Sequence, residues 1–183
     1  DAVGTAGDVN GDGYTDVIVG AGAFDNGQPG EGRTFVYHGS ATGLSLTSGW
    51  TAESDHTDAV FGSSVGTAGD VNGDGYADVI VGAQFFTNGQ QFNEGRAFVY
   101  HGSATGLSLT SNWTAESDQA FAHFGQSVGT AGDVNGDGYA DVIVGAHRFD
   151  NGQDGEGRAF VFYGNGGPGL SLRPQQRRGD DTA

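Results

Sequence analysis

Short apolar runs, each bounded by Gly, Asn or Asp, recur along the whole chain. The runs DVIVGA and RAFVYH are rich in β-branched and aromatic residues and are too short for ordinary helices. The polar residues between the runs are of the types that form turns. No segment shows a convincing amphipathic helical period, so the pattern predicts an all-β fold.

The apolar pattern is organised as a threefold repeat. The segment VGTAGDVNGDGYADVIVGA at 65–83 recurs unchanged at 128–146, and with the single substitution Thr15 at 3–21. A second block, FVYHGSATGLSLTS at 35–48, recurs in the second unit and, in degraded form, in the third. Units of about 62 residues therefore make up nearly the whole chain.

Each unit is expected to form four antiparallel strands. In the middle unit these are Gly62–Val71, Asp78–Ala83, Arg96–His101 and Leu107–Glu116. A single small sheet cannot bury both of its faces, so neighbouring units must stack, and radially stacked four-stranded sheets form a β-propeller. The expected organisation is three blades at approximately 1–60, 61–123 and 124–172, followed by a C-terminal tail or linker at 173–183.

Three blades are too few for a closed ring, because propellers typically carry four to eight. The first unit lacks the Phe-Gly pair that opens the others at Phe61-Gly62 and Phe124-Gly125. The last unit loses the Trp-Thr-Ala-Glu-Ser stretch of the first two. The segment is therefore either part of a longer propeller or one half of a homodimeric ring, and the sequence leaves both open.

Composition excludes several classes of function. The 183 residues include 36 Gly and 23 Asp or Glu against seven Lys or Arg, which gives a formal charge of −16. Nucleic acid and anionic membrane surfaces are disfavoured, because both are bound by basic side chains. No run is apolar over the roughly 18 residues needed for membrane insertion. The absence of Cys removes disulfides, thiolate zinc sites and thiol catalysis.

An acidic nine-residue loop, DVNGDGYTD or DVNGDGYAD, occurs once per unit. It places oxygen side chains at positions one, three, five and nine, and a hard cation such as calcium takes six to eight oxygens. Each loop is predicted to bind one calcium ion, three in total, through these four side chains and the backbone carbonyl of the Tyr at position seven. The predicted ligands are Asp8, Asn10, Asp12, Tyr14, Asp16, Asp70, Asn72, Asp74, Tyr76, Asp78, Asp133, Asn135, Asp137, Tyr139 and Asp141.

The simpler interpretation of such loops is a set of Asn-Gly and Asp-Gly turns with solvated acids. Without an ion, however, three carboxylates in nine residues repel one another, and the sequence repeats that arrangement three times. An EF-hand requires Glu at position twelve and a helix after the loop, whereas position twelve here is Val19, Val81 or Val144 within an expected strand.

Other residues receive structural interpretations. The Glu-Gly-Arg that precedes each third strand, as at Glu94 and Arg96, is expected to be a blade-to-blade ion pair or hydrogen-bond anchor rather than an anion site. Trp50 and Trp113 are expected to pack between blades rather than to serve as sugar platforms. No unit supplies a distinctive nucleophile motif, so catalysis and catalytic residues are not expected.

The chain resembles FG-GAP repeats, the blade type of integrin α-subunit propellers. In the second unit the resemblance lies in Phe61-Gly62, the Asp-rich loop and Val81-Gly82-Ala83, and it covers the chain from residue 1 to about 172. It implies structural calcium on one rim of the propeller, away from the main ligand face. It also implies an extracellular or cell-surface, secreted location. No ligand-binding residue is transferred.

The expected function is a non-catalytic, calcium-stabilised scaffold for adhesion or protein interaction. Two alternatives stay open: a lectin that binds glycans between blades, and an accessory domain of a larger secreted enzyme. The tripeptide Arg178-Gly179-Asp180 matches the sequence that integrins bind, but chance explains it better in a chain so rich in Gly and Asp.

Overall fold

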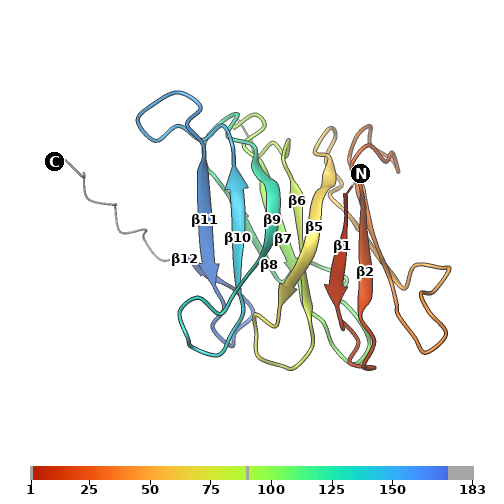
Figure 1. Ribbon diagram of the computed structural model, residues 1–183. Helices are drawn as coiled ribbons and strands as arrows, with labels where there is room; N and C mark the ends of the chain where they lie inside the picture. Colours follow the sequence, from red (N-terminus) through yellow and green to blue (C-terminus); the bar gives the residue numbers. More distant parts are fainter. Residues whose placement is uncertain (1, 90, 173–183) are drawn as a thin grey trace.

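The computed structural model describes residues 2–89 and 91–172. These residues form three four-stranded antiparallel sheets and no helix (Figure 1), so the predicted all-β fold built of propeller blades is confirmed. Over the same residues, nothing has the length and apolar character of a membrane-crossing helix. The tail at 173–183, with Arg178-Gly179-Asp180, lies outside the described residues.

The strands of each sheet follow one another in chain order. The first blade contains β1 (Ala2–Gly7), β2 (Asp16–Ala21), β3 (Arg33–Tyr37) and β4 (Trp50–Glu53). The second contains β5 (Phe61–Gly69), β6 (Asp78–Ala83), β7 (Arg96–Tyr100) and β8 (Trp113–Glu116). The third contains β9 (Phe124–Gly132), β10 (Asp141–Ala146), β11 (Arg158–Tyr163) and β12 (Ser171–Leu172).

The expected fourth strand of the middle unit was too long. Its alternating Leu-Ser-Leu-Thr pattern predicts a strand from Leu107, but β8 begins at Trp113. The intervening residues form a loop whose Asn112 side-chain oxygen accepts the His101 N–H at 2.9 Å. Leu107 is buried against the neighbouring blade as a loop residue, with 7% of its surface exposed. Its burial thus comes from contact between blades and not from strand pairing.

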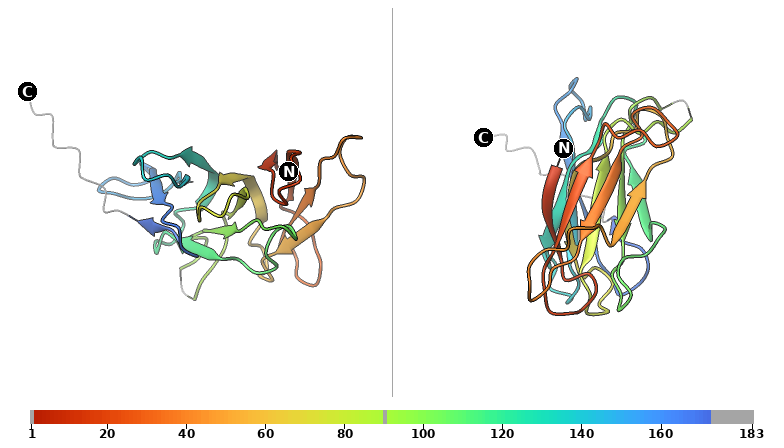
Figure 2. Two further views of the ribbon diagram at one scale, coloured as in Figure 1. Left: turned by 90° about the horizontal axis from the view of Figure 1, so that it is seen from below. Right: turned by 90° about the vertical axis from the view of Figure 1, so that its right-hand side faces the viewer.

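The hydrophobic core lies between the blades rather than within any one of them. One cluster joins the first and second blades and includes Ile18 and Phe98, and a second joins the second and third blades and includes Ile80 and Phe160. The first strands of neighbouring blades contact each other, and their order can be followed in the left view of Figure 2. Stacking of neighbouring units therefore supplies the burial that a single sheet lacks.

The Phe-Gly pair fixes how closely neighbouring blades approach. Phe61 is fully buried, and its ring meets Phe98 edge to face with centroids 5.1 Å apart. A Cβ on Gly20 would lie 2.1 Å from the Gly62 carbonyl oxygen, and Gly62 itself has a φ of 85°. The backbones of the Phe-Gly and Val-Gly-Ala segments touch here, which explains why both positions need glycine.

Both tryptophans contact the following blade. The Trp50 ring is 6% exposed, lies edge to face with Tyr100 at 4.9 Å, and donates its indole N–H to the Ser108 carbonyl. Trp113 makes the equivalent ring contact with Phe162 at 4.8 Å. The predicted packing role is confirmed.

Candidate metal loops

The three Asp-rich loops join the first and second strands of each blade. They leave the sheets at the same end, which is the lower end in Figure 1. Two glycines in each loop allow the tight turn, and those of the first loop, Gly11 and Gly13, have φ values of 73° and 88°. A nearly identical peptide, which differs only at Thr15, thus produces the same turn in all three blades.

The acid at position one shapes the loop. In the first blade, Asp8 Oδ1 accepts the N–H groups of Gly11 and Asp12 at 2.7 and 3.1 Å, and Oδ2 accepts the N–H of Gly13 at 2.8 Å. Asp70 and Asp133 make the equivalent three bonds in their loops. The N–H of Gly138, the strongest of several such donors to Asp133, helps to hold the pKa of that carboxyl below its usual value.

Positions three and five lie against each other across the turn. Asn10 Oδ1 accepts the Asp12 N–H at 3.1 Å, and the Asn10 amide group donates to Asp12 Oδ2 at 3.1 Å. Asp12 Oδ1 in turn accepts the Tyr14 N–H at 2.9 Å. The same pattern recurs in the second and third loops. The structure therefore brings the predicted ligands at positions one, three and five into one compact turn.

The acid at position nine makes a different set of hydrogen bonds from the residues at positions one, three and five. Asp16 is fully buried at the start of β2, where its two oxygens accept the N–H groups of Val9 and Gly39 at 3.0 and 2.8 Å. Asp78 and Asp141 make the same pair of bonds. This carboxylate therefore joins its own loop to the loop between the third and fourth strands, a role that sequence reasoning missed.

In the second blade, burial makes the charged form of this acid costly. Burial raises the pKa of the Asp78 carboxyl to about 7. Hydrogen bonds from the N–H groups of Gly102 and Val71 lower this pKa in part, and the negative charges of Asp74 and Asp70 raise it further. A buried carboxyl beside two further acids, with only backbone amides to compensate its charge, is an environment in which an added cation is favourable.

A histidine adjoins the first loop. The Asn10 side-chain nitrogen lies 2.8 Å from His38 Nδ1, just beyond the end of β3. His101 occupies the equivalent place in the second blade, and burial lowers the pKa of its imidazole. Sequence reasoning gave these residues no role, although their shared place in the repeat was the available signal. In the first blade the ring positions the amide that faces the turn.

The donor set of each loop fits a hard cation. The side chains at positions one, three, five and nine offer carboxylate and amide oxygens, and an oxygen that accepts one N–H, such as Asp8 Oδ2, retains a further lone pair. Oxygen donors of this kind suit calcium better than the softer metals that prefer Cys or His. The assignment of the individual ligands, including the Tyr14, Tyr76 and Tyr139 carbonyls, stays a prediction.

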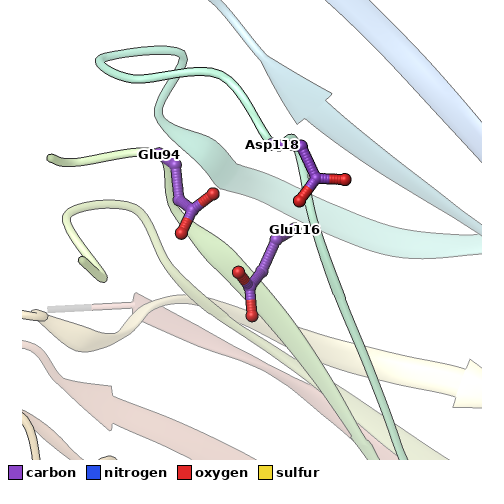
Figure 3. A group of neighbouring side chains, drawn as sticks. All are labelled: Glu94, Glu116 and Asp118. Atoms are coloured by element: carbon purple, nitrogen blue, oxygen red, sulfur yellow. The ribbon is translucent and has the colours of Figure 1, made fainter. Parts of the chain in front are cut away.

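A second acidic group lies at the opposite end of the middle blade. Among the described residues, Glu94, Glu116 and Asp118 are the one set of three acids whose carboxylate oxygens approach within 4.8 Å of one another (Figure 3). Glu94 is 1% exposed, and its Oε1 accepts the Asn88 N–H at 3.2 Å. Such a group could hold a divalent cation, but Arg96 already supplies a positive charge to Glu116.

This cluster decides between the two roles expected for the Glu-Gly-Arg motif, because its ion pair does not join two blades whereas a hydrogen-bond anchor between blades is present. The ion pair of Arg96 joins it to Glu116 on the adjacent strand β8 of the same blade, not to another blade. The contact between blades comes instead from the backbone, where the Glu94 carbonyl accepts the Phe124 N–H at 2.8 Å. Register explains the ion pair, because β7 and β8 place Arg96 directly opposite Glu116.

Two carboxyl groups in this cluster have shifted pKa values. Burial, with Glu116 nearby, raises the pKa of Glu94 to about 7. Burial also acts to raise the pKa of Glu116, but hydrogen bonds from Asn88 and Arg96 outweigh it and leave that pKa below its usual value. The negative charge is therefore concentrated on Glu116, beside the guanidinium group.

Comparison with known proteins places these features in a family. The sequence model of the FG-GAP repeat matches residues 2–37, 61–100 and 124–162, which is one match per blade. Each match begins in the first strand of a blade and contains the Asp-rich loop.

Curated relatives include integrin alpha-4 of Xenopus laevis, which is 32% identical over 151 residues, and integrin alpha-V of Gallus gallus, which is 34% identical over 157 residues. These alignments cover 80% and 78% of the chain, and each covers 14% of the relative. Phosphatidylinositol-glycan-specific phospholipase D of Mus musculus is 31% identical over 168 residues, which is 87% of the chain and 20% of that protein. The chain thus spans a small part of the relatives that it matches.

Proposed function

The chain belongs to the FG-GAP repeat family, and from that premise we propose that it is a calcium-binding, non-catalytic β-propeller scaffold for adhesion or protein interaction. Three calcium ions, one per blade, are held by the Asp-rich loops. The observation that supports this most directly is the threefold recurrence of one arrangement of oxygen donors, with matching hydrogen bonds in every loop.

The ligand residues of a loop are oriented in different ways for binding the ion. The acid at position one is oriented by three backbone N–H groups, and the Asn and Asp at positions three and five are oriented by each other. When bound, calcium supplies positive charge that offsets the repulsion among these acids. The buried acid at position nine joins the loop to the rest of the blade, so occupancy of the loop would also stiffen the blade.

The proposed location is extracellular or at the cell surface. Its support is the likeness to proteins named as integrin alpha subunits. Calcium sites of extracellular modules generally have dissociation constants of about 10⁻⁴–10⁻³ M, and the proposed sites are of that class. A protein partner would meet the end of the blades opposite the Asp-rich loops. Phe92 and Phe121 are 59% and 54% exposed there, and the Phe121 N–H donates to the Phe92 carbonyl at 2.7 Å.

Neither alternative function gains support. A lectin with tryptophan sugar platforms is not favoured, because Trp50 is buried against Tyr100 and its indole N–H is already bonded. The match to a phospholipase D covers 20% of that enzyme, so its catalysis is not transferred to this chain.

Isothermal titration of the calcium-free chain with calcium chloride tests the metal proposal. We expect three sites, and we expect the variant Asp74→Asn to lose one of them. Asparagine keeps an oxygen that can accept the Tyr76 N–H, which Asp74 Oδ1 now accepts at 3.0 Å, so the turn is retained while a charged ligand is removed.

The matched control is Asp154→Asn, which removes the same charge from an exposed residue outside the three loops. It should still bind three ions. The metal proposal is wrong if calcium produces no heat of binding, or if both variants bind it as the unaltered chain does.

A further inference from the structure

The Asp-rich loops of the first two blades each lie against the loop of the following blade. The ring of Tyr76 in the second loop covers Gly11 in the first, since a Cβ added to Gly11 would lie 2.6 Å from that ring. The ring of Tyr139 in the third loop covers Gly73 in the second in the same way, at 2.5 Å. Both contacts belong to the two blade junctions inside the chain.

A backbone hydrogen bond accompanies each ring contact. The Ala77 N–H donates to the Asp8 carbonyl at 3.0 Å, and the Ala140 N–H donates to the Asp70 carbonyl at 2.9 Å. The aspartates stand at position one of their loops, and the alanines stand at position eight of the loops that follow. Each bond therefore joins a predicted ligand residue of one loop to a residue that lies between two predicted ligands of the next.

A second connection joins the first two loops through their buried acids. The Val9 N–H donates to Asp16 Oδ2 at 3.0 Å, and the Val9 carbonyl accepts the Ser103 N–H of the second blade at 3.1 Å. The neighbouring Gly102 N–H donates to Asp78 Oδ1 at 2.9 Å. The two acids at position nine, both fully buried, are therefore linked by a short run of backbone hydrogen bonds.

Position two of these loops also belongs to the core between blades. Val9 is fully buried in a cluster against which Ala77 of the second blade packs. Val71 is 2% exposed in a cluster against which Ala140 of the third blade packs. Because protein interiors are close-packed, a loop that changes conformation must disturb the blade that follows it.

We propose that calcium binding at an Asp-rich loop is coupled to the docking of the following blade, with Tyr76 and Tyr139 as the positioning residues. This inference rests on the proposed calcium binding, and it adds that each of the first two sites is completed by two blades rather than one. The ring and the N–H of the following blade hold the turn from outside. Order in the turn therefore favours order at the junction, and the reverse, because coupling between two sites is reciprocal.

The charge of the loops acts in the opposite direction. A filled loop is less negative than an empty one, so it attracts a cation to the neighbouring loop less strongly. Salt weakens this effect, which falls off over about 8 Å at physiological ionic strength. A substitution that changes no charge therefore distinguishes coupling through contacts from an effect of charge.

Hydrogen exchange of two single amides, measured by NMR, tests the coupling. In the unaltered chain, we expect exchange at Ala77 and Ala140 to be slow with calcium and faster with a chelator. Asp12→Asn removes a charged ligand from the first loop only, and asparagine can still accept the Tyr14 N–H. With calcium present, this variant should exchange Ala77 about fivefold faster or more, which is the lower end of typical coupling between sites. The rate at Ala140 should change much less.

The matched control is Asp137→Asn, which makes the same change in the third loop. The bond from Ala77 joins the first and second loops, so its exchange should stay slow in this control. Equal exchange at Ala77 in the unaltered chain and in Asp12→Asn would show that its protection comes from its own loop, and the coupling would be wrong. A chain that gives no heat of calcium binding would instead overturn the proposed function, and this inference with it.

Substitution of Tyr76 tests the positioning role without a change of charge. The Asp74→Asn variant serves as the background, because only the first and third loops are expected to bind calcium in it. There, Tyr76→Ala should weaken calcium binding at one of the two remaining sites by about fivefold. Tyr76→Phe should restore the affinity, because ring carbons make the contact with Gly11.

Isothermal titration measures both affinities, and circular dichroism melts establish that each variant is folded. Unchanged affinities in Tyr76→Ala would overturn the positioning role, as would a loss that phenylalanine does not restore. An equal loss at both sites would also contradict it, because the ring covers the first loop.

Discussion

At the scale of single residues, glycine sets the distance between blades. A Cβ on Gly82 would lie 1.9 Å from the Gly125 carbonyl oxygen, which is backbone and cannot rotate away. The equivalent Gly145 lies on the open side of the third blade, where the nearest atom at 2.4 Å is the hydroxyl of Ser127. The same sequence position therefore has no room for a side chain in the second blade but can admit a small one in the third.

This difference predicts that a Gly→Ala substitution at the two equivalent positions will cost different amounts of stability. Gly82→Ala should lower the free energy of unfolding by about 2–4 kcal/mol, because the second and third blades must separate to admit the methyl group. Gly145→Ala should cost less than about 1 kcal/mol, because the serine can change rotamer. Urea denaturation of both variants measures the costs, and equal losses would mean that close backbone contact does not govern this position.

Glu94 should make stability fall as the pH rises. Its pKa is raised by burial to about 7, so the folded state keeps a proton that the unfolded chain releases near its ordinary pKa of 4.5. Stability from this group is complete below the unfolded pKa and is lost as the pH rises to about 7. The slope for one proton is at most about 1.4 kcal/mol per pH unit.

The comparison of Glu94→Gln with the unaltered chain isolates that contribution. Glutamine cannot ionise and keeps an oxygen for the Asn88 N–H, so the variant should gain relative stability between pH 5 and pH 7. Glu156→Gln is the matched control, because it alters an exposed residue of the same Glu-Gly-Arg motif. A stability difference for Glu94→Gln that is independent of pH would contradict the assignment.

At the scale of elements, the sequence predicts what depends on local pattern. Asp78–Ala83 is correct at both ends, because a continuous β-branched run between turn residues admits few alternatives. The strand expected from Leu107 was wrong, because an apolar loop residue that packs on another blade has the same alternating signature. Strand register could not be predicted from the sequence either, so an ion pair of Arg96 between blades was one of the two expectations, and the other, a hydrogen-bond anchor, is the one that the Glu94 carbonyl provides.

In the candidate metal loops, too, local features could be predicted from the sequence and contacts between distant residues could not. Spacing alone brings positions one, three and five together, because they lie within one turn. The environment of position nine could not be predicted, because Asp16 accepts an N–H from Gly39, which is distant in sequence and close only through the pairing of β2 with β3.

At the scale of the whole molecule, the proposed calcium ions act on stability and charge together. If each site has a dissociation constant near 10⁻⁴ M, roughly 1 mM calcium stabilises the fold by about 1.4 kcal/mol per site, or about 4 kcal/mol for three. That is a large share of the stability of an ordinary domain. Excess EGTA should therefore lower the melting temperature by about 8–16 °C for a chain of this size.

Melting measurements in sodium chloride distinguish calcium binding at the loops from a general screening of the negative charge. The formal charge of −16 is reduced when three divalent ions bind, so part of any calcium effect is relief of repulsion, and sodium chloride should supply that part without binding. A variant with Asp12→Asn, Asp74→Asn and Asp137→Asn should melt low and respond little to EGTA. An EGTA effect that vanishes in high salt, or that persists in this variant, would show that calcium acts away from the loops.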